Sequence, residues 1–200
     1  MLTRKLAALV ALAAVLALAG CGEDDEPAAH AETHTASNGD EFNDADVAFA
    51  TDMIPHHAQA LSMVDLTLDR SLDPEVQQLV EDIRTAQAPE IEQMTDWLTA
   101  WEEPVPETMR DHANAHGDGH VETGDMPGMM SAEQMAELEE APDAEFQDLF
   151  LEMMIEHHEG AVEMARTEQS EGHFGPAVDL AESIESSQTE EIELMQGLLG

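Results

Sequence analysis

MIPHHAQALSM, residues 53–63, places two adjacent histidines between two methionines. Apolar and small residues recur at intervals of three and four through this stretch and the turn before it. Phe49, Met53, His56 and Ala60 therefore fall on one face of a helix. This spacing predicts a helix whose inward stripe carries the first histidine, while the second histidine falls at the edge of the stripe.

The same pattern returns 101 residues later as MIEHHEGAVEM, residues 154–164, with no gap between the copies. The identity at this offset continues into the following helix. The matched pairs are Phe49 and Phe150, Met53 and Met154, Ile54 and Ile155, His56 and His157, His57 and His158, Ala60 and Ala161, Met63 and Met164, Ile83 and Ile184, Gln87 and Gln188, Glu90 and Glu191, Met94 and Met195, and Leu98 and Leu199. A register that holds through a helix, a turn and a second helix indicates two copies of one αα-hairpin. We therefore predict an all-α four-helix bundle, in which the two hairpins pack their apolar stripes together around a pseudo-two-fold axis.

The first repeat, residues 44–101, should contain two helices. The first is expected over residues 44 to about 70. Asp73 followed by Pro74 predicts the start of the second, because aspartate is a good N-cap acceptor and proline suits the first helical turn. That second helix should end near residue 101, just before two prolines.

Residues 102–142 connect the two repeats. SAEQ, residues 131–134, is a capping box that should open a short helix, which Pro142 ends. The second repeat, residues 143–200, is then expected to hold long helices over residues 143 to about 171 and from residue 175 to the C-terminus.

The connecting segment is unusually rich in histidine and methionine. Residues 109–130 contain three histidines and four methionines, although a flexible loop has no core for methionine to fill. Short histidine-rich tracts are a compositional signal of metal binding. The residues that could form such a secondary loop site are His112, His116, His120, Met126, Met129 and Met130. The other interpretation is a linker that carries these residues by accident.

The N-terminus predicts export. Two basic residues precede an apolar run over residues 6–18, which is shorter than the roughly 20 residues that a membrane-spanning helix needs. Leu18 to Cys21, LAGC, resembles a bacterial lipoprotein processing site. We therefore expect residues 1–20 to be a signal peptide and Cys21 to carry a lipid anchor at the outer face of the cell membrane.

The remaining chain divides into two parts. Residues 21–43 are acidic and unpatterned, and we interpret them as a disordered tether. Residues 44–200 form the predicted bundle domain. The chain carries 45 acidic and 6 basic residues, a formal net charge of −39. Such a surface repels phosphate backbones, so nucleic acid is not an expected partner.

Cysteine chemistry is excluded if the single cysteine is lipidated. No thiolate then remains for a zinc finger, an iron–sulfur cluster or a nucleophile, and methionine is the remaining soft ligand. The chain has 13 methionines against 5 phenylalanines and 2 tryptophans, although methionine also fills cores without binding anything.

Two interpretations account for the buried histidines. In the first, they hydrogen-bond to glutamine and glutamate side chains of the partner helices as a polar network that fixes the helix register. In the second, imidazole nitrogen and thioether sulfur converge on a metal ion. That mixture of donors, with no thiolate, suits copper, and Cu(I) in particular, better than magnesium, calcium or manganese.

MIPHHAQALSM, DMPGMMSAEQMAELEEA and FLEMMIEHHEGAVEMA resemble the motifs of the family catalogued as domain of unknown function 305. The resemblance covers about residues 44–200 and implies an exported, ferritin-like helical bundle that binds copper or silver through histidine and methionine. The positions that match the family motif are Met53, His56, His57, Met63, Met154, His157, His158 and Met164. From their place in the inner stripe of the second helix of each repeat, Met94 and Met195 join them as candidate ligands.

We therefore expect a membrane-anchored copper-binding protein that buffers or delivers the ion, and not an enzyme. A metal-free interaction module is the main alternative. A di-iron or di-manganese oxidase fits less well, because its Glu-x-x-His pairs are missing. Haem could only be bound non-covalently, since no C-x-x-C-H motif is present. The sequence leaves open a homo-oligomer or a copper-trafficking partner.

Overall fold

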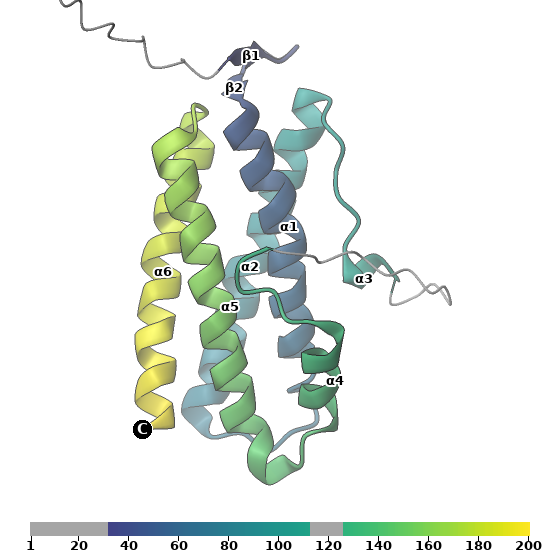
Figure 1. Ribbon diagram of the computed structural model, residues 1–200, viewed down its shortest axis with the longest axis vertical. Helices are drawn as coiled ribbons and strands as arrows, with labels where there is room; N and C mark the ends of the chain where they lie inside the picture. The colour runs from purple at the N-terminus through teal and green to yellow at the C-terminus, as the bar shows by residue number, and fades with distance from the viewer. Residues whose placement is uncertain (1–31, 113–125) are drawn as a thin grey trace, which may run out of the picture. The chain divides into compact units, whose positions relative to one another are not determined.

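The computed structural model describes residues 32–112 and 126–200 of the chain. Four long helices dominate this part and pack as a bundle (Figure 1). They are α1 (Asp44–Asp65), α2 (Pro74–Trp101), α5 (Asp143–Glu171) and α6 (Gly175–Leu199). Two short helices, α3 (Met109–His112) and α4 (Ala132–Glu140), lie in the connection between the hairpins. The predicted all-α helical bundle is therefore confirmed.

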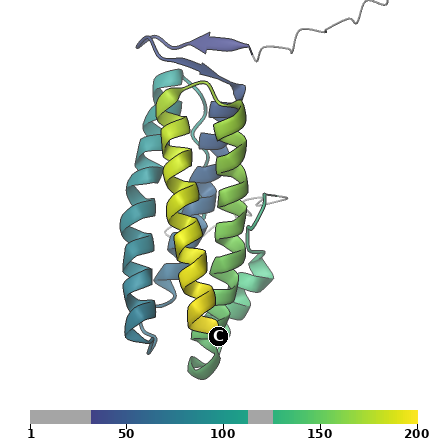
Figure 2. The ribbon, with the colours of Figure 1, turned by 90° about the vertical axis from the view of Figure 1, so that its left-hand side faces the viewer.

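The two hairpins meet through their first helices. α1 packs on α2 and α5 packs on α6, while the largest contact between the hairpins joins α1 to α5. The colour gradient shows that α1 and α5 run in opposite directions (Figures 1 and 2). A two-fold relation between antiparallel helices brings the same position of each repeat to the same height. The middle of α1 consequently faces the middle of α5.

The helix ends follow the local sequence in most places. Asn43 caps α1, because its side chain accepts the N–H groups of Ala45 and Asp46 while the Asp46 carboxylate accepts the N–H of Asn43. The predicted capping box of α4 is confirmed: the Ser131 hydroxyl accepts the N–H of Gln134, whose side chain accepts the N–H of Ser131.

Two boundary predictions need correction. Asp73 makes no side-chain cap at the start of α2. Its carboxylate instead accepts a hydrogen bond from the amide of Gln147 at 3.1 Å, so it joins α2 to α5. The first helix ends at Asp65 and not near Arg70, because the following residues form turns. Arg70 then donates hydrogen bonds to the main-chain oxygens of Glu139 and Ala141, at the end of α4.

The predicted disordered tether of residues 21–43 is wrong at its C-terminal end. Two short strands, β1 (Thr33–Thr35) and β2 (Glu41–Asn43), pair antiparallel there. Phe42 anchors the hairpin because its side chain is 4% exposed and stacks on Trp101 at 4.5 Å between ring centroids. One buried aromatic ring thus orders a segment whose composition is otherwise that of a linker.

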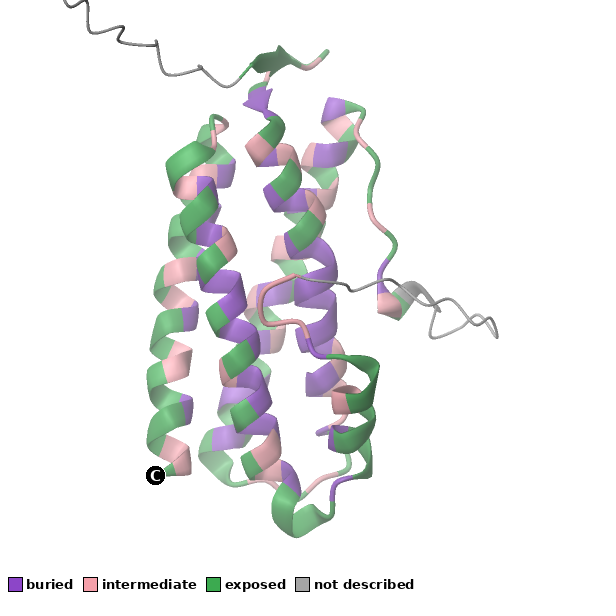
Figure 3. Cartoon of the chain, viewed as in Figure 1, coloured by how far each residue is buried: buried purple, intermediate pink, exposed green. Residues whose placement is uncertain are grey.

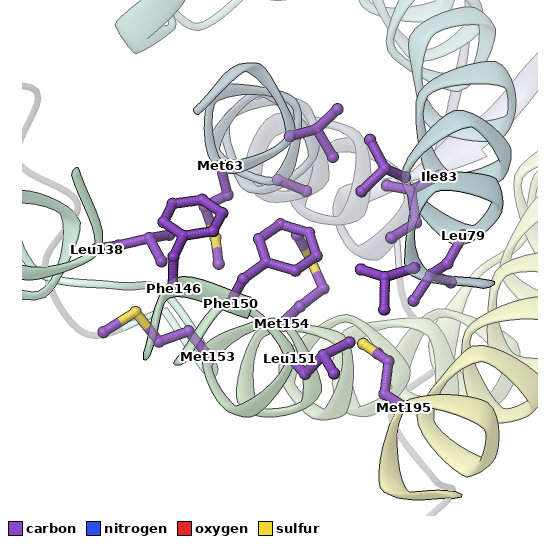
Figure 4. Close-up of a cluster of buried hydrophobic side chains, with 14 of the residues drawn as sticks. Met63, Leu79, Ile83, Leu138, Phe146, Phe150, Leu151, Met153, Met154 and Met195 are labelled. Carbon is purple, nitrogen blue, oxygen red and sulfur yellow. The ribbon is translucent and has the colours of Figure 1, made fainter. Parts of the chain in front are cut away.

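The core consists of two apolar clusters, one on each side of the middle of the bundle. The hairpin-side cluster includes Phe42, Met53 and Trp101. The α4-side cluster includes Leu138 and Phe150 and is drawn in Figure 4. The buried residues of the long helices face inward (Figure 3). Among the described helices, none is both long enough and apolar enough to cross a membrane.

Candidate metal site

Four buried histidines separate the two apolar clusters. We call His56, His57, His157 and His158 the histidine layer, and each of them has 0% of its surface exposed. The predicted burial of the first histidine in each repeat is confirmed. The second histidine, which was expected at the edge of the stripe, is as deeply buried, because the partner helix of its own hairpin covers it.

His56 and His157 form what we call the inner pair. Their ring centroids are 3.8 Å apart and their planes are inclined by 41°. The Nε2 atom of His56 lies 3.0 Å from the carbonyl oxygen of Pro127. A carbonyl can only accept, so this nitrogen carries the proton and donates it. Within the part of the chain that the structure describes, Nδ1 of His56 and both ring nitrogens of His157 have no hydrogen-bond partner.

Burial keeps the inner pair neutral. Loss of hydration lowers the pKa of His56 to about 3, and repulsion from His57 adds to this effect. Burial likewise holds the pKa of His157 well below its usual value, helped by repulsion from His56 and His158. A neutral imidazole with an unused lone pair is the form of histidine that binds metal ions.

The outer histidines have different surroundings. The Nε2 of His57 lies 2.7 Å from Oε2 of Glu90, and Nε2 of His158 lies 2.7 Å from Oε2 of Glu191. Each pair joins the two helices of one hairpin. The sequence allowed such a polar network for His56 and His157, but the hydrogen bonds to glutamate are made by the outer histidines instead. The network does not extend to the inner pair, whose only hydrogen bond in the described part of the chain is the one to Pro127.

Gln87 and Gln188 extend the polar region into the neighbouring turns. Both side chains are 2% exposed. Among described residues, neither Nε2 nor Oε1 of Gln87 has a partner, and Oε1 of Gln188 also lacks one. These amides could have satisfied the inner histidines, yet they make no hydrogen bond to them. The middle of the bundle thus holds several polar atoms that the protein leaves available.

The predicted methionine ligands lie on both sides of the histidine layer. Met53 and Met154 each precede an inner histidine by one helical turn, about 4.5 Å along the axis. Met63 and Met164 follow it by about two turns, roughly 10 Å. The α4-side cluster holds Met63, Met154 and Met195, whose sulfur atoms are visible in Figure 4. The hairpin-side cluster holds Met53 and Met94, with Met164 packed against it.

The predicted loop site is only partly visible. His116 and His120 lie outside the described residues, and His112 ends α3. Met126 and Met129 are half-buried. Met130 needs correction, because it is 1% exposed and packs in the α4-side cluster instead of lying in an open loop.

Sequence reasoning missed two contributors to the site, Pro127 and Gln59. The side-chain amide of Gln59 donates to the main-chain oxygen of Met130 at 2.8 Å and accepts the N–H of the same residue at 2.6 Å. These bonds hold the segment that carries the Pro127 carbonyl against α1. The sequence offered only a weak signal, since the pair Gln59 and Gly160 is one of several differences between the repeats in this stretch.

The donor set favours a soft ion. In the described ranges, no group of three or more His, Cys, Asp or Glu side chains is arranged to hold a metal ion. The candidate ligands next to the inner pair along α1 and α5 are Met53 and Met154, one turn before each histidine. Neutral nitrogen and thioether sulfur in a buried site fit Cu(I) or a similarly soft ion.

Comparison with known proteins identifies relatives. The family model described as "Domain of unknown function (DUF305)" matches residues 46–199. No curated protein matches the chain. A DUF305 protein from Streptomyces coelicolor, described as secreted, has a structure with 34% sequence identity and a TM-score of 0.66, covering 78% of this chain and 90% of its own. A DUF305 fragment from Deinococcus radiodurans is 32% identical with a TM-score of 0.66, over 84% of this chain and 99% of its own.

A third similar structure contains copper. CopM in its Cu(II)-bound form is 29% identical to this chain, with a TM-score of 0.62, over 77% of this chain and 95% of its own. CopM structures with bound Cu(I) and bound silver also match, with TM-scores of 0.60. The fold of this chain is thus one that binds soft metal ions in at least one other protein.

Proposed function

The chain belongs to the DUF305 family, and from this premise we propose that it is an exported, membrane-anchored protein that binds copper and buffers or delivers it. The inner pair supplies the nitrogen ligands. Met53 and Met154, one turn away on either side, are the nearest of the candidate sulfur ligands along the two helices that carry the pair. The outer histidines join α1 to α2 and α5 to α6 and hold the inner pair in place.

One observation carries this proposal: two neutral imidazoles face each other in the core with three ring nitrogens that have no partner among the described residues. A buried polar atom without a hydrogen bond costs about 1–3 kcal/mol. A protein with no use for these nitrogens could replace the histidines with apolar residues. A bound metal ion would satisfy them.

The choice of copper rests on the ligands and on a relative. Thioether and imidazole favour copper over hard cations, and CopM is known with Cu(I) and Cu(II). The acidic surface, with a net charge of −39, attracts cations toward the protein. Lipid on Cys21 would keep the protein at the membrane. Mass spectrometry of protein extracted from the cell envelope tests this anchor, and an unmodified Cys21 that still follows residues 1–20 would contradict it.

Copper titrations on single variants test the metal site. His56→Ala and His157→Ala should each lower copper affinity by more than about 100-fold, because even residues that only hydrogen-bond to metal ligands account for about 10–100-fold. His112→Ala is the control, since His112 belongs to the connecting segment and should leave the core site intact. Isothermal calorimetry, with circular dichroism to confirm folding, provides the measurement. Equal copper binding by all three folded variants would rule out the inner pair as the metal site, and no copper binding by the unaltered protein would leave the metal-free interaction module as the better interpretation.

A further inference from the structure

Residues 126–130, MPGMM, lie as a strap across α1 and α5 (Figure 1). On the α1 side, the strap is held by the two hydrogen bonds between Gln59 and the main chain of Met130. Three residues before Met130, the carbonyl oxygen of Pro127 accepts a hydrogen bond from Nε2 of His56. The strap therefore contacts the site through a main-chain atom, and this contact does not depend on its side chains.

On the α5 side, the strap lies directly against the helix main chain. Gly128 has φ of +73°, a conformation that favours glycine, and a side chain there would collide with the main-chain oxygens of Glu156 and His157. A methyl group on Gly160 would overlap the carbonyl of Pro127. Two glycines facing each other thus allow the strap to approach α5 closely enough for its carbonyl to reach His56.

The strap accounts for one of the differences between the two repeats. Gln59 and Gly160 occupy the same position of the repeat, and both serve the strap: the first binds it and the second leaves room for it. As a result, the inner histidines are not equivalent. His56 has a carbonyl at Nε2, whereas His157 has no partner at either ring nitrogen among the described residues.

We infer that the strap is a positioning element of the metal site, which fixes the proton of His56 on Nε2 and so makes Nδ1 its metal-binding atom. This inference rests on the proposed function. Histidines that bind metals usually donate the proton of their other nitrogen to a carboxylate or a main-chain carbonyl, which sets the tautomer and the ring orientation. Pro127 provides that acceptor, and Gln59 and Gly160 keep Pro127 in place. None of the three needs to touch the metal.

Gly160→Ala tests the strap without removing a ligand. The added methyl group should displace Pro127 from α5, and copper affinity should fall by about 10–100-fold, as when other hydrogen-bond partners of metal ligands are removed. Gly197→Ala is the matched control, because it is also a glycine-to-alanine change inside a helix, on α6, and its new methyl group would have no atom within 4 Å. It should bind copper as the unaltered protein does. Gln59→Leu, which breaks the anchor on α1, should weaken copper binding in the same direction as Gly160→Ala.

The tautomer gives a second readout that does not depend on copper. In the metal-free protein, ¹⁵N NMR of the histidine rings should show the His56 proton on Nε2, and Gly160→Ala should shift the equilibrium toward Nδ1. An unchanged tautomer and an unchanged copper affinity in Gly160→Ala would overturn the inference. If the unaltered protein failed to bind copper at all, the proposed function would fail, while the tautomer measurement would still decide whether the strap positions His56.

Discussion

His56 and His57 are neighbours in the sequence and equally buried, but their rings have different surroundings. The outer histidine of each repeat donates to a glutamate at 2.7 Å, and this distance is the same in both repeats. The inner histidines share no such arrangement: one has a main-chain carbonyl and the other has no partner in the described residues. The repeat has therefore kept the outer pairs symmetric, whereas the inner pair has become asymmetric.

This difference separates two uses of a buried polar residue. A histidine bonded to a glutamate of the neighbouring helix holds the hairpin together and specifies its register. A histidine without a partner lowers stability, since its polar atoms have lost water and gained nothing in return. His157, whose two ring nitrogens both lack a partner among the described residues, is therefore the part of the layer that folding alone does not explain.

The largest expected effect is on copper affinity. His157→Leu should weaken copper binding by more than about 100-fold, whereas His158→Leu should weaken it by about 10–100-fold at most, the range for residues that act through other ligands. Competition against chelators of known affinity provides the measurement. Equal losses in the two variants would mean that the outer histidines are also direct ligands, and the distinction between the pairs would be lost for binding.

The next effect concerns the metal-free protein. The two substitutions should change its free energy of unfolding in opposite directions. His157→Leu removes two unpartnered nitrogens and should leave stability unchanged or raise it by about 1–3 kcal/mol. His158→Leu leaves the carboxylate of Glu191 without its partner and should lower stability by about 1–3 kcal/mol. Urea unfolding monitored by circular dichroism gives both values. A stabilising His158→Leu would show that the outer pairs are not structural.

The smallest effect appears in the dependence of stability on pH. The folded-state pKa of His56 is about 3, below the unfolded value of 6.5, so the unfolded chain takes up more protons in acid. The contribution of neutral His56 to the free energy of unfolding is complete above pH 6.5. It is lost as the pH falls from 6.5 toward the folded-state pKa of about 3. The pKa of His157 is lowered in the same way. His157→Leu should therefore flatten the acid side of the stability curve by up to about 1.4 kcal/mol per pH unit, the limit for one proton.

Glu168 offers a control in which the dependence of stability on pH has the opposite sign. Burial raises its pKa to about 8, and repulsion from the carboxylate of Asp46 adds to the rise. Its contribution is present below its unfolded pKa of 4.5 and is lost as the pH rises through about 8. Glu168→Gln should therefore make the loss of stability between pH 8 and pH 5 steeper, whereas His157→Leu makes it shallower. Denaturant titrations at several pH values would show this, and parallel curves for both variants would contradict the assignment.

The sequence predicted the parts of the molecule that depend on periodicity. The repeat was sufficient to predict the bundle and the burial of His56 and His157, because helical spacing determines which side chains face inward. It could not predict which buried histidine would find a partner, since that depends on the distance between helices. His57 is the example, because its place at the edge of the stripe becomes interior once Glu90 of α2 covers it.

The missed elements depend on single contacts. Phe42 orders the β-hairpin by stacking on Trp101, a contact between residues far apart in the sequence and without a local pattern. The strap is held by a side-chain amide and by the close approach of Gly160, and neither feature has a periodicity. The mismatch between Gln59 and Gly160 did not single out this place, because nearby pairs such as Ala58 and Glu159 also differ.

Because Gly160 lies against the main chain of Pro127, we expect substitutions in these two stretches of the chain to be correlated during evolution. A substitution at Gly160 is tolerated only when the strap has shifted or shortened, and a longer side chain at Gly128 requires a change in α5. Among descendants of this gene, these positions should change together or not at all. The strap contacts a different side of each repeat, so the two copies are under different constraints. We therefore expect that one copy could not replace the other, although many of their inward-facing residues are identical.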